Sequence, residues 1–224
     1  MHLEVLLTCV AGVALVLLYR RDAALQKQQR GQFFADCLSL FQSYRVEQEG
    51  RAYPHLRGKY RDRTVTIEPI VDHLAWRKLP VLWVQVTVLE PTRFGGVLDF
   101  VARPTGAEYF SHIYNLTHRM DLPADWPQEA LLYCDDPEAV MPLEMLTPHL
   151  PQLGDPKFKE LVVTPKGVRL VWRVEQASRA HYASFREIKF ATASLDLELA
   201  RHVLDSALAI ADTVSVDEPQ RKVA

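Results

Sequence analysis

Aspartate and histidine supply the side chains of this 224-residue chain that could transfer protons. Asp72 and His73 are adjacent, and an aspartate beside an imidazole can orient it as a general base. Adjacent residues of a strand point to opposite faces, however, so these two side chains would rarely bond each other. His112 and His118 could join them only through the fold. These four residues are candidates for a dispersed catalytic site, while a capping aspartate and exposed histidines are the favoured interpretation.

The spacing of the histidines argues against a metal site. Ligands on one helix are three or four residues apart, and ligands on one strand are two apart. His112 and His118 are six residues apart, which fits one strand face only if the whole segment between them is extended. The chain also has no glycine-rich phosphate loop and no GxGxxG, GxSxG, HExxH, CxxC or calcium-loop motif. The sequence therefore predicts no metal and no cofactor.

Cysteine is the remaining candidate nucleophile. Cys134 stands before Asp135 and Asp136 at the start of an expected helix, a position that favours a thiolate. The two carboxylates oppose that effect and suit a helix cap, so the capping interpretation is favoured. The chain has three cysteines without paired spacing, which is typical of a protein in a reducing compartment.

The N-terminal segment is the most distinctive part of the sequence. From Val5 to Leu18 it has no charge, and only Thr8 is polar. A helix from Leu3 to Tyr19 would span roughly 25 Å at about 1.5 Å per residue, near the short limit of a bilayer crossing. A cleaved signal peptide would need basic residues before this run and a small-x-small site after it, and both are missing. We expect residues 1–21 to be a transmembrane anchor, with a signal peptide or a buried helix as alternatives.

The charges beside this segment predict its orientation. Four basic residues follow it and none precedes it: Arg20, Arg21, Lys27 and Arg30. Basic flanks stay on the cytoplasmic side of a membrane. We therefore expect a single-pass protein with its N-terminus outside and the rest of the chain in the cytoplasm.

The net charge of −2 is a cancellation between two regions. Residues 20–63 hold ten basic and five acidic residues, so the rest of the chain carries −7. Four basic residues alternate and would share one face of an extended segment: Arg57, Lys59, Arg61 and Arg63. Two interpretations of these residues are equally favoured. They contact anionic lipid headgroups, at about 1 kcal/mol per basic residue, or they form a solvated hairpin face. The acidic remainder argues against nucleic-acid binding.

Periodicity predicts the elements that would position these residues. A helical repeat over residues 22–50 predicts a juxtamembrane amphipathic helix, with its apolar face on Phe33, Phe34, Cys37, Leu38, Phe41 and Tyr44. Alternation then predicts strands at 56–60, 64–68, 81–90, 97–102 (paired with 81–90), 131–133, 161–164, 168–174 and 188–191. Pro165-Lys166-Gly167 is a hairpin turn. Helices are expected from Asp136 to Leu146 or His149, with a kink at Pro142, and from Ser194 to Thr213.

This order of elements predicts the fold class. Regular strand–helix alternation is missing, so a parallel sheet is not expected. We expect an α+β fold: an N-terminal transmembrane helix followed by a mainly antiparallel sheet with helices packed on one face. The cytoplasmic domain would cover residues 51–214, followed by a flexible tail at 215–224. A content of 48% hydrophobic and 24% charged residues excludes a disordered chain.

The sequence favours a binding role over a catalytic one. An anchor, a well-formed domain and no visible catalytic motif suggest a single-pass membrane protein whose cytoplasmic domain binds a partner. The lipid bilayer and another membrane protein or complex are the expected partners, in assembly or regulation. The alternatives are a membrane-tethered enzyme with a dispersed Asp/His site and a peripheral domain that binds lipid through its basic face.

Overall fold

A computed structural model describes residues 2–72, 79–106, 108, 110–178 and 190–215. Its strands are β1 (Ser43–Glu47), β2 (His55–Tyr60), β3 (Arg63–Asp72), β4 (Val81–Val88), β5 (Leu98–Val101), β6 (His118–Arg119), β7 (Leu131–Cys134), β8 (Phe158–Thr164) and β9 (Gly167–Gln176). Its helices are α1 (His2–Gly31), α2 (Leu150–Leu153) and α4 (Leu197–Val214), with 3-10 segments η1 (Leu38–Leu40), η2 (Ile113–Asn115) and η3 (Leu143–His149).

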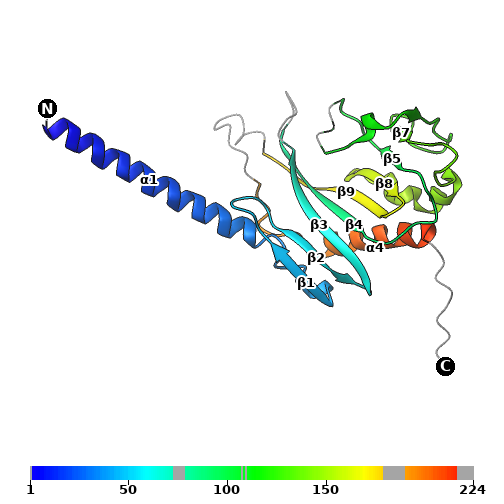
Figure 1. Cartoon of the computed structure of the whole chain (residues 1–224), viewed down its shortest axis with the longest axis horizontal. Helices are drawn as coiled ribbons and strands as arrows, with labels where there is room; N and C mark the ends of the chain where they lie inside the picture. The colour runs from blue at the N-terminus through cyan, green and yellow to red at the C-terminus, as the bar shows by residue number, and fades with distance from the viewer. Residues whose placement is uncertain (1, 73–78, 107, 109, 179–189, 216–224) are drawn as a thin grey trace.

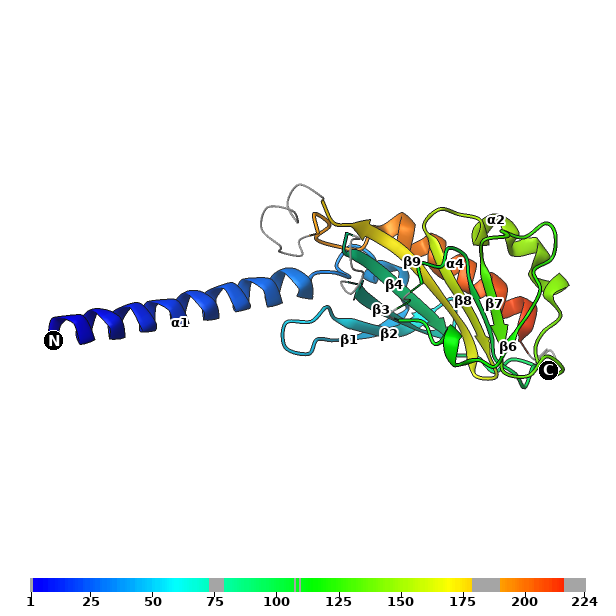
Figure 2. The same cartoon turned by 90° about the horizontal axis from the view of Figure 1, so that it is seen from above.

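The described strands form one nine-stranded sheet in the order β1-β2-β3-β4-β9-β8-β5-β7-β6. Every neighbouring pair is antiparallel. Figures 1 and 2 both show α1 projecting from one end of the sheet domain, with β7 toward the other end. The expected α+β fold with a large antiparallel sheet is confirmed.

Alternation along β4 directs one set of side chains to the core. Leu82, Val84, Val86 and Val88 are buried, as the two-residue repeat predicts, because successive strand residues point to opposite faces. The same face carries Leu56 of β2 and Trp172 of β9. The apolar stripe of α4, which includes Val203, Leu204, Ala207 and Ala211, packs against this face.

Helix α4 begins and ends close to the sequence prediction. Asp196 caps it, and its side chain accepts a hydrogen bond from Leu199 N at 2.9 Å. The cap satisfies one of the free N–H groups at the helix start. On the exposed side of α4, Asp205 accepts a hydrogen bond from the hydroxyl of Tyr60 at 2.6 Å. This bond ties the end of β2 to the helix.

The β8–β9 hairpin forms as predicted, with Thr164 opposite Gly167. Gly167 has φ +151°, in the region that favours glycine. A Cβ at this position would lie 2.1 Å from Val88 O. The hairpin therefore needs glycine here both for its backbone angle and for its close contact with the end of β4.

The predicted helix over 22–50 is wrong beyond Gly31. Helix α1 ends there, turns follow, and Ser43–Glu47 is strand β1. Phe33 and Phe34 are adjacent and both fully buried, and they pack edge to face at 5.2 Å. The turn that buries them is held by a hydrogen bond from Leu195 N to Phe33 O. Phe33 and Phe34 therefore belong to the same apolar core as the strands that follow residue 51.

Two further predictions differ from the structure. The strand at 97–102 forms as β5, but it pairs with β7 and β8, because β9 occupies the free edge of β4. The helix expected from Asp136 is replaced by a turn, in which Asp136 accepts from Glu138 N, and by η3 after Pro142. Proline interrupts helical hydrogen bonding at that point. Half of the expected strand at 188–191 lies outside the described residues, and residues 190 and 191 are not in a strand. The expected tail at 215–224 lies outside them except for Ser215.

The N-terminal helix spans 30 residues. Large apolar side chains along it are exposed, from Leu7 to Leu25. Within the described residues, no helix meets the length and apolarity that a membrane crossing requires.

Candidate functional site

The structure does not bring the four Asp/His candidates together. Asp72 ends β3, and His118 lies in the edge strand β6, six strands further along the sheet order. At about 4.8 Å per strand this separates them by roughly 29 Å. His112 lies between, just before η2, and its side chain is exposed. His73 lies outside the described residues.

The basic residues of the β2–β3 hairpin divide into two groups. Arg57 and Lys59 are exposed on β2 and point away from α4. The chain turns at Arg61 and Asp62, which have φ of 46° and 65°. Arg61 pairs with Asp205 at 3.0 Å, and Arg63 pairs with Glu90 at 2.7 Å and with Asp212. The four residues therefore do not form the single basic face that strict alternation predicts.

The four juxtamembrane basic residues all lie in α1. Arg20, Arg21 and Lys27 are exposed, and Arg30 donates a hydrogen bond to the carbonyl of Arg51 at 2.8 Å. These residues lie in the part of α1 between its apolar run and the sheet domain.

Cys37 and Cys134 are buried in the core. Burial raises the pKa of the Cys37 thiol to about 11, and burial also raises the pKa of Cys134, with Asp135 and Asp136 adding to the effect. Asp135 accepts hydrogen bonds from Val97 N and Asp136 N, both at 2.7 Å. These observations agree with the capping interpretation of the Cys134 segment. Neither thiol has the lowered pKa of a nucleophile.

The face of the sheet opposite α4, here called the outer face, carries the most unusual group of charges. One row of register partners crosses it, consisting of Arg57, Thr66, Thr87, Arg169, Val162 and Asp99. Glu160 lies two residues from Val162 on β8, so it shares this face with Asp99. Asp99 is 2% exposed and Glu160 is fully buried. Buried carboxylates of this kind are rare in proteins unless they are paired.

We define Asp99, Glu160 and Arg169 as the buried acidic cluster. Nη2 of Arg169 lies 3.7 Å from Oε2 of Glu160, too far for a hydrogen bond. Asp99 and Glu160 hydrogen-bond each other, and the side chain of Ser111 hydrogen-bonds both of them. Among the described residues, no hydrogen-bond partner is found for Nε of Arg169. The cluster therefore holds two carboxyl groups that share one guanidinium and one hydroxyl as neighbours.

This composition explains the protonation of the cluster. Burial raises the pKa of Asp99 from 3.8 to about 8, and the neighbouring charge of Glu160 adds to the effect, while Arg169 opposes it. Burial also raises the pKa of Glu160. One guanidinium cannot neutralise two buried carboxylates, so the cluster holds a proton near neutral pH.

A second buried ion pair fixes the segment that follows β5. Nζ of Lys159 lies 2.8 Å from Oε2 of Glu108, and both side chains are nearly fully buried. Lys159 also donates a hydrogen bond to the carbonyl of Arg103. The hydroxyl and the backbone N–H of Thr105 donate to Oε1 of Glu108. These hydrogen bonds satisfy the buried charges of the pair, so its role is structural.

A cavity of about 320 Å³ opens beside the acidic cluster, and we call it the Asp99 pocket. Its charged and titratable lining residues are Asp99, Arg169, His112 and Lys166. Gln85, Thr87 and Thr164 add neutral polar groups, and Leu89, Val97, Leu116 and Val162 form an apolar wall. A largely apolar cavity with a few converging polar groups is the usual form of a small-ligand site.

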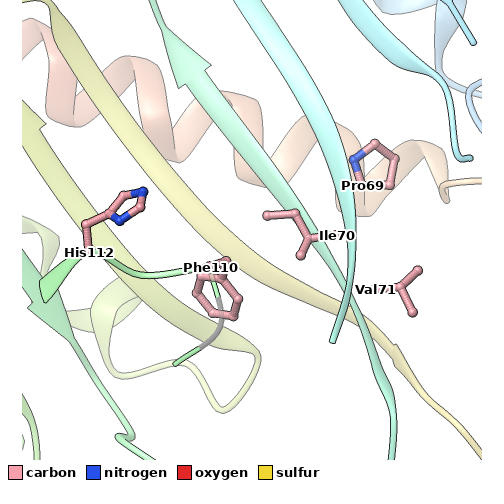
Figure 3. Close-up of a pocket in the computed structure, with 5 residues that line it drawn as sticks. All are labelled: Pro69, Ile70, Val71, Phe110 and His112. Atoms are coloured by element: carbon pink, nitrogen blue, oxygen red, sulfur yellow. The ribbon is translucent and has the colours of Figure 1, made fainter. Parts of the chain in front are cut away.

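A second cavity of about 400 Å³ lies along β3 (Figure 3). Figure 3 shows the Ile70 side chain directed toward Phe110, while Pro69 and Val71 lie on the other side of β3. The Phe110 ring also packs against Trp83 at 5.7 Å. His112 lines both cavities and is the one titratable residue among the five that line this cavity. Apart from His112, its lining side chains are apolar, so it offers fewer reactive groups than the Asp99 pocket.

The described residues contain no group of three or more His, Cys, Asp or Glu side chains arranged to hold a metal ion. The carboxylate oxygens of the acidic cluster come from two residues, Asp99 and Glu160. Two carboxyl groups are fewer than the several protein oxygen ligands that a bound Ca²⁺ takes.

Sequence reasoning missed Asp99 and Glu160, although a signal was present. Asp99 interrupts an apolar strand, Val97-Leu98-Asp99-Phe100-Val101, and Glu160 directly precedes the apolar run Leu161-Val162-Val163. A charged residue within a buried run is rare enough to merit attention. Its proximity to a second carboxylate could not be predicted, because it depends on β5 pairing with β8.

Comparison with known proteins finds no relative. No family model matches the chain, and no curated protein and no solved structure is significantly similar to it.

Proposed function

We propose that this chain is a single-pass membrane protein in which α1 is the anchor and the sheet domain binds a partner at the cytoplasmic surface. The observation that carries the proposal is the exposed apolar surface of α1. Leu15, Val16, Leu17, Leu18 and Tyr19 are each 57–67% exposed. Successive helix residues are about 100° apart, so five in a row point in all directions around the axis. A partner helix would cover one stripe of such a surface, whereas lipid would cover all of it.

The sheet domain does not need α1 for its core. Among the described residues, the apolar core begins at Phe33, after the end of α1. Figures 1 and 2 show the helix extending away from the sheet. An anchor that projects from an independently packed domain is consistent with this arrangement.

The apolar run is short for a membrane crossing. The uncharged stretch from Val5 to Leu18 has a length of roughly 21 Å at about 1.5 Å per residue, against a hydrocarbon core of about 30 Å. Local thinning of the bilayer and long arginine side chains reaching to the headgroups can accommodate such a mismatch. Arg20 and Arg21 follow the apolar run, at the position from which such side chains would reach the headgroups. Their charge also favours a cytoplasmic sheet domain.

The edge strand β1 is the surface that we propose for the partner. All five of its residues are exposed, and it is the last strand on its side of the sheet. An edge strand presents unpaired backbone groups that can pair with another chain. Tyr44 and Val46 are 51% and 37% exposed and add apolar surface. Because β1 lies beside the end of α1 in Figure 1, the partner would be another membrane protein or a complex at the membrane.

Two alternatives have less support. A dispersed Asp/His enzyme site would need Asp72 and His118 together, and the sheet order separates them. A peripheral lipid-binding domain would use a basic face, but Arg61 and Arg63 are paired with carboxylates of Asp205, Glu90 and Asp212. Arg57 and Lys59 remain exposed, so charge contributes to membrane contact in this proposal without replacing the anchor.

Alkaline carbonate extraction of membranes tests the anchor. We expect the full chain to stay in the membrane pellet, and the V13K/L17K variant to be released, because a lysine at the centre of a span costs about 3 kcal/mol. The matched control is L25K, which places the same charge in the same helix beyond the arginine pair and should stay in the pellet. Extraction of the unmodified chain would overturn the anchor, and release by high salt would favour the peripheral alternative.

A reporter fused after Ala224 tests the orientation, with activity expected in its cytoplasmic form. For the partner, the chain purified in detergent should carry a stoichiometric membrane protein that V46K loses. V46K should still pellet with membranes, because its charge is far from the apolar run. Retention of the same partner by V46K would show that β1 is not the binding surface.

A further inference from the structure

The two carboxyl groups of the buried acidic cluster share a proton. Asp99 and Glu160 hydrogen-bond each other, and a hydrogen bond between two carboxyl groups needs a proton on one of them. Burial and the charge of Glu160 raise the pKa of Asp99 to about 8, in agreement with a protonated pair at neutral pH. The pair therefore carries at most one negative charge, and of its two members Asp99 lines the Asp99 pocket.

The other charged groups that line the pocket are basic. They are Arg169 and Lys166, and His112 adds no negative charge in either protonation state. Lys166 and His112 are exposed, so they lie where the pocket meets solvent. Two positive charges stand against at most one negative charge. A monovalent anion would balance the charge of the pocket, whereas a cation would add to its excess.

Arg169 is the group that could hold such an anion. Its side chain is 23% exposed, and Nη2 lies 3.7 Å from Oε2 of Glu160, too far for a hydrogen bond. Among the described residues, Nε also has no hydrogen-bond partner. A guanidinium presents its N–H donors in a planar fork that fits a carboxylate. Since unpaired donors are costly inside a protein, a carboxylate against Arg169 would be stabilising.

We propose that the Asp99 pocket binds a short-chain monocarboxylate, with its carboxylate against Arg169 and its alkyl chain along the apolar wall. A volume of about 320 Å³ is at the lower end of the range for ligand sites, so the ligand is small. The proposal does not depend on the anchor proposed above. The wall that would contact the alkyl chain consists of Leu89, Val97, Leu116 and Val162.

Carboxylate binding would depend on the proton of the acid pair. Above pH 8 Asp99 ionises, and a further negative charge then lies beside the bound carboxylate. The affinity should therefore fall as the pH rises through 8, because the ligand favours the protonated pair. The groups that face Asp99 are Glu160 on β8, Arg169 on β9, Ser111, His112 and Lys166, with the Glu108–Lys159 pair beyond them.

Titration calorimetry of the full chain in detergent at low salt tests the proposal, with sodium butyrate as the probe. We expect saturable binding at one site at pH 7. Butanol and n-butylammonium, which have the same chain length, should bind at least tenfold more weakly, because neither supplies a negative charge. Undetectable butyrate binding, or butylammonium binding at least as tight, would overturn the proposal.

Two variants assign the site. R169Q removes the guanidinium and should weaken butyrate binding at least tenfold. L116W fills the pocket from its apolar wall and should weaken binding equally, with all charges intact, so it serves as the test if R169Q does not fold. R57Q is the matched control, because Arg57 is an exposed arginine of the same row that does not line the pocket. Melting curves establish that each variant is folded, and unchanged binding by folded R169Q or folded L116W would refute the assignment.

D99N tests the role of the shared proton. Asparagine is neutral, as protonated Asp99 is, so D99N should bind butyrate at pH 7 within about threefold of the unmodified chain. Between pH 7 and pH 9 the unmodified chain should lose affinity several-fold, and D99N should lose much less. A loss of affinity that is equal in the two proteins would show that Asp99 does not control the binding of the carboxylate.

Discussion

Arg51 and Tyr19 are in contact although they are 32 residues apart in the sequence. Nη2 of Arg51 donates a hydrogen bond to the Tyr19 hydroxyl at 2.8 Å, and the guanidinium lies 5.2 Å from the ring centroid. Nearby, the Gln48 side chain donates to the Lys27 carbonyl at 3.0 Å. The β1–β2 loop is thereby bound along the second half of α1. If α1 spans a membrane, this loop lies at the level of the headgroups.

The first prediction concerns the distance of this loop from the membrane. A nitroxide attached to E49C, in a chain that also carries C9A and is reconstituted in vesicles, should be relaxed strongly by nickel-chelating headgroups. Glu49 is exposed and adjacent to the loop contacts, so the label would not disturb the Arg51–Tyr19 bond. A label at H118C on β6, at the far edge of the sheet, is the control and should be relaxed much less. Equal relaxation at both positions would contradict the proposed placement.

The second prediction concerns the bond between β2 and α4. Y60F removes the hydroxyl that donates to Asp205 at 2.6 Å, a bond to a charged acceptor at a partly buried position. The free energy of unfolding should fall by about 1–2 kcal/mol. The control Y44F removes a hydroxyl from an exposed tyrosine on β1 and should change stability by less than about 0.5 kcal/mol. Urea denaturation measures both, and equal midpoints would contradict the prediction.

Burial of Tyr60 and its bond to Asp205 also raise the pKa of the Tyr60 hydroxyl to about 12, burial being the larger cause. The Tyr60 proton therefore stays in place throughout the physiological pH range. The difference in stability between Y60F and the unmodified chain should be constant from pH 6 to 9.

The sequence predicts the elements of this domain where a single repeat decides them. Alternation identified β4 and its buried residues, and the apolar stripe identified α4 almost to its ends. Prediction from the sequence failed where tertiary contacts override the local pattern. Phe33 and Cys37 have helical spacing but belong to a turn, because the core needs both Phe33 and its neighbour Phe34. The pairing of β5 with β8, and with it the Asp99 pocket, depends on long-range strand order that no local pattern contains.

The third prediction concerns the close contact of the β8–β9 turn. G167A places a Cβ about 2 Å from Val88 O at a φ that favours glycine, so both strain and clash oppose it. G106A is the matched control, because Gly106 also has positive φ, at +88°, but no atom within 4 Å of the added Cβ. We expect G106A to lose about 1 kcal/mol of unfolding free energy and G167A at least about 2 kcal/mol more. Similar losses in thermal denaturation would show that the turn can shift away from Val88.

The last prediction uses the pKa of Asp99 to predict how stability depends on pH. In the unfolded chain this carboxyl ionises near its ordinary pKa of 3.8, whereas in the folded protein its pKa is about 8. Between these values the unfolded state binds fewer protons, so the free energy of unfolding should fall with rising pH, by up to about 1.4 kcal/mol per unit from this group. Above pH 8 the Asp99 carboxyl is ionised in both the folded and the unfolded state. Its destabilising contribution to the free energy of unfolding then no longer changes with pH. D99N has no carboxyl to ionise, so its stability relative to the unmodified chain should increase from pH 5 to pH 8 and then stop increasing. Glu160 also has a raised pKa, so its ionisation further lowers the free energy of unfolding as the pH rises. D99N retains this contribution. Urea denaturation across this pH range measures the difference, with D121N expected to parallel the unmodified chain, and a constant difference for D99N would contradict the raised pKa of Asp99.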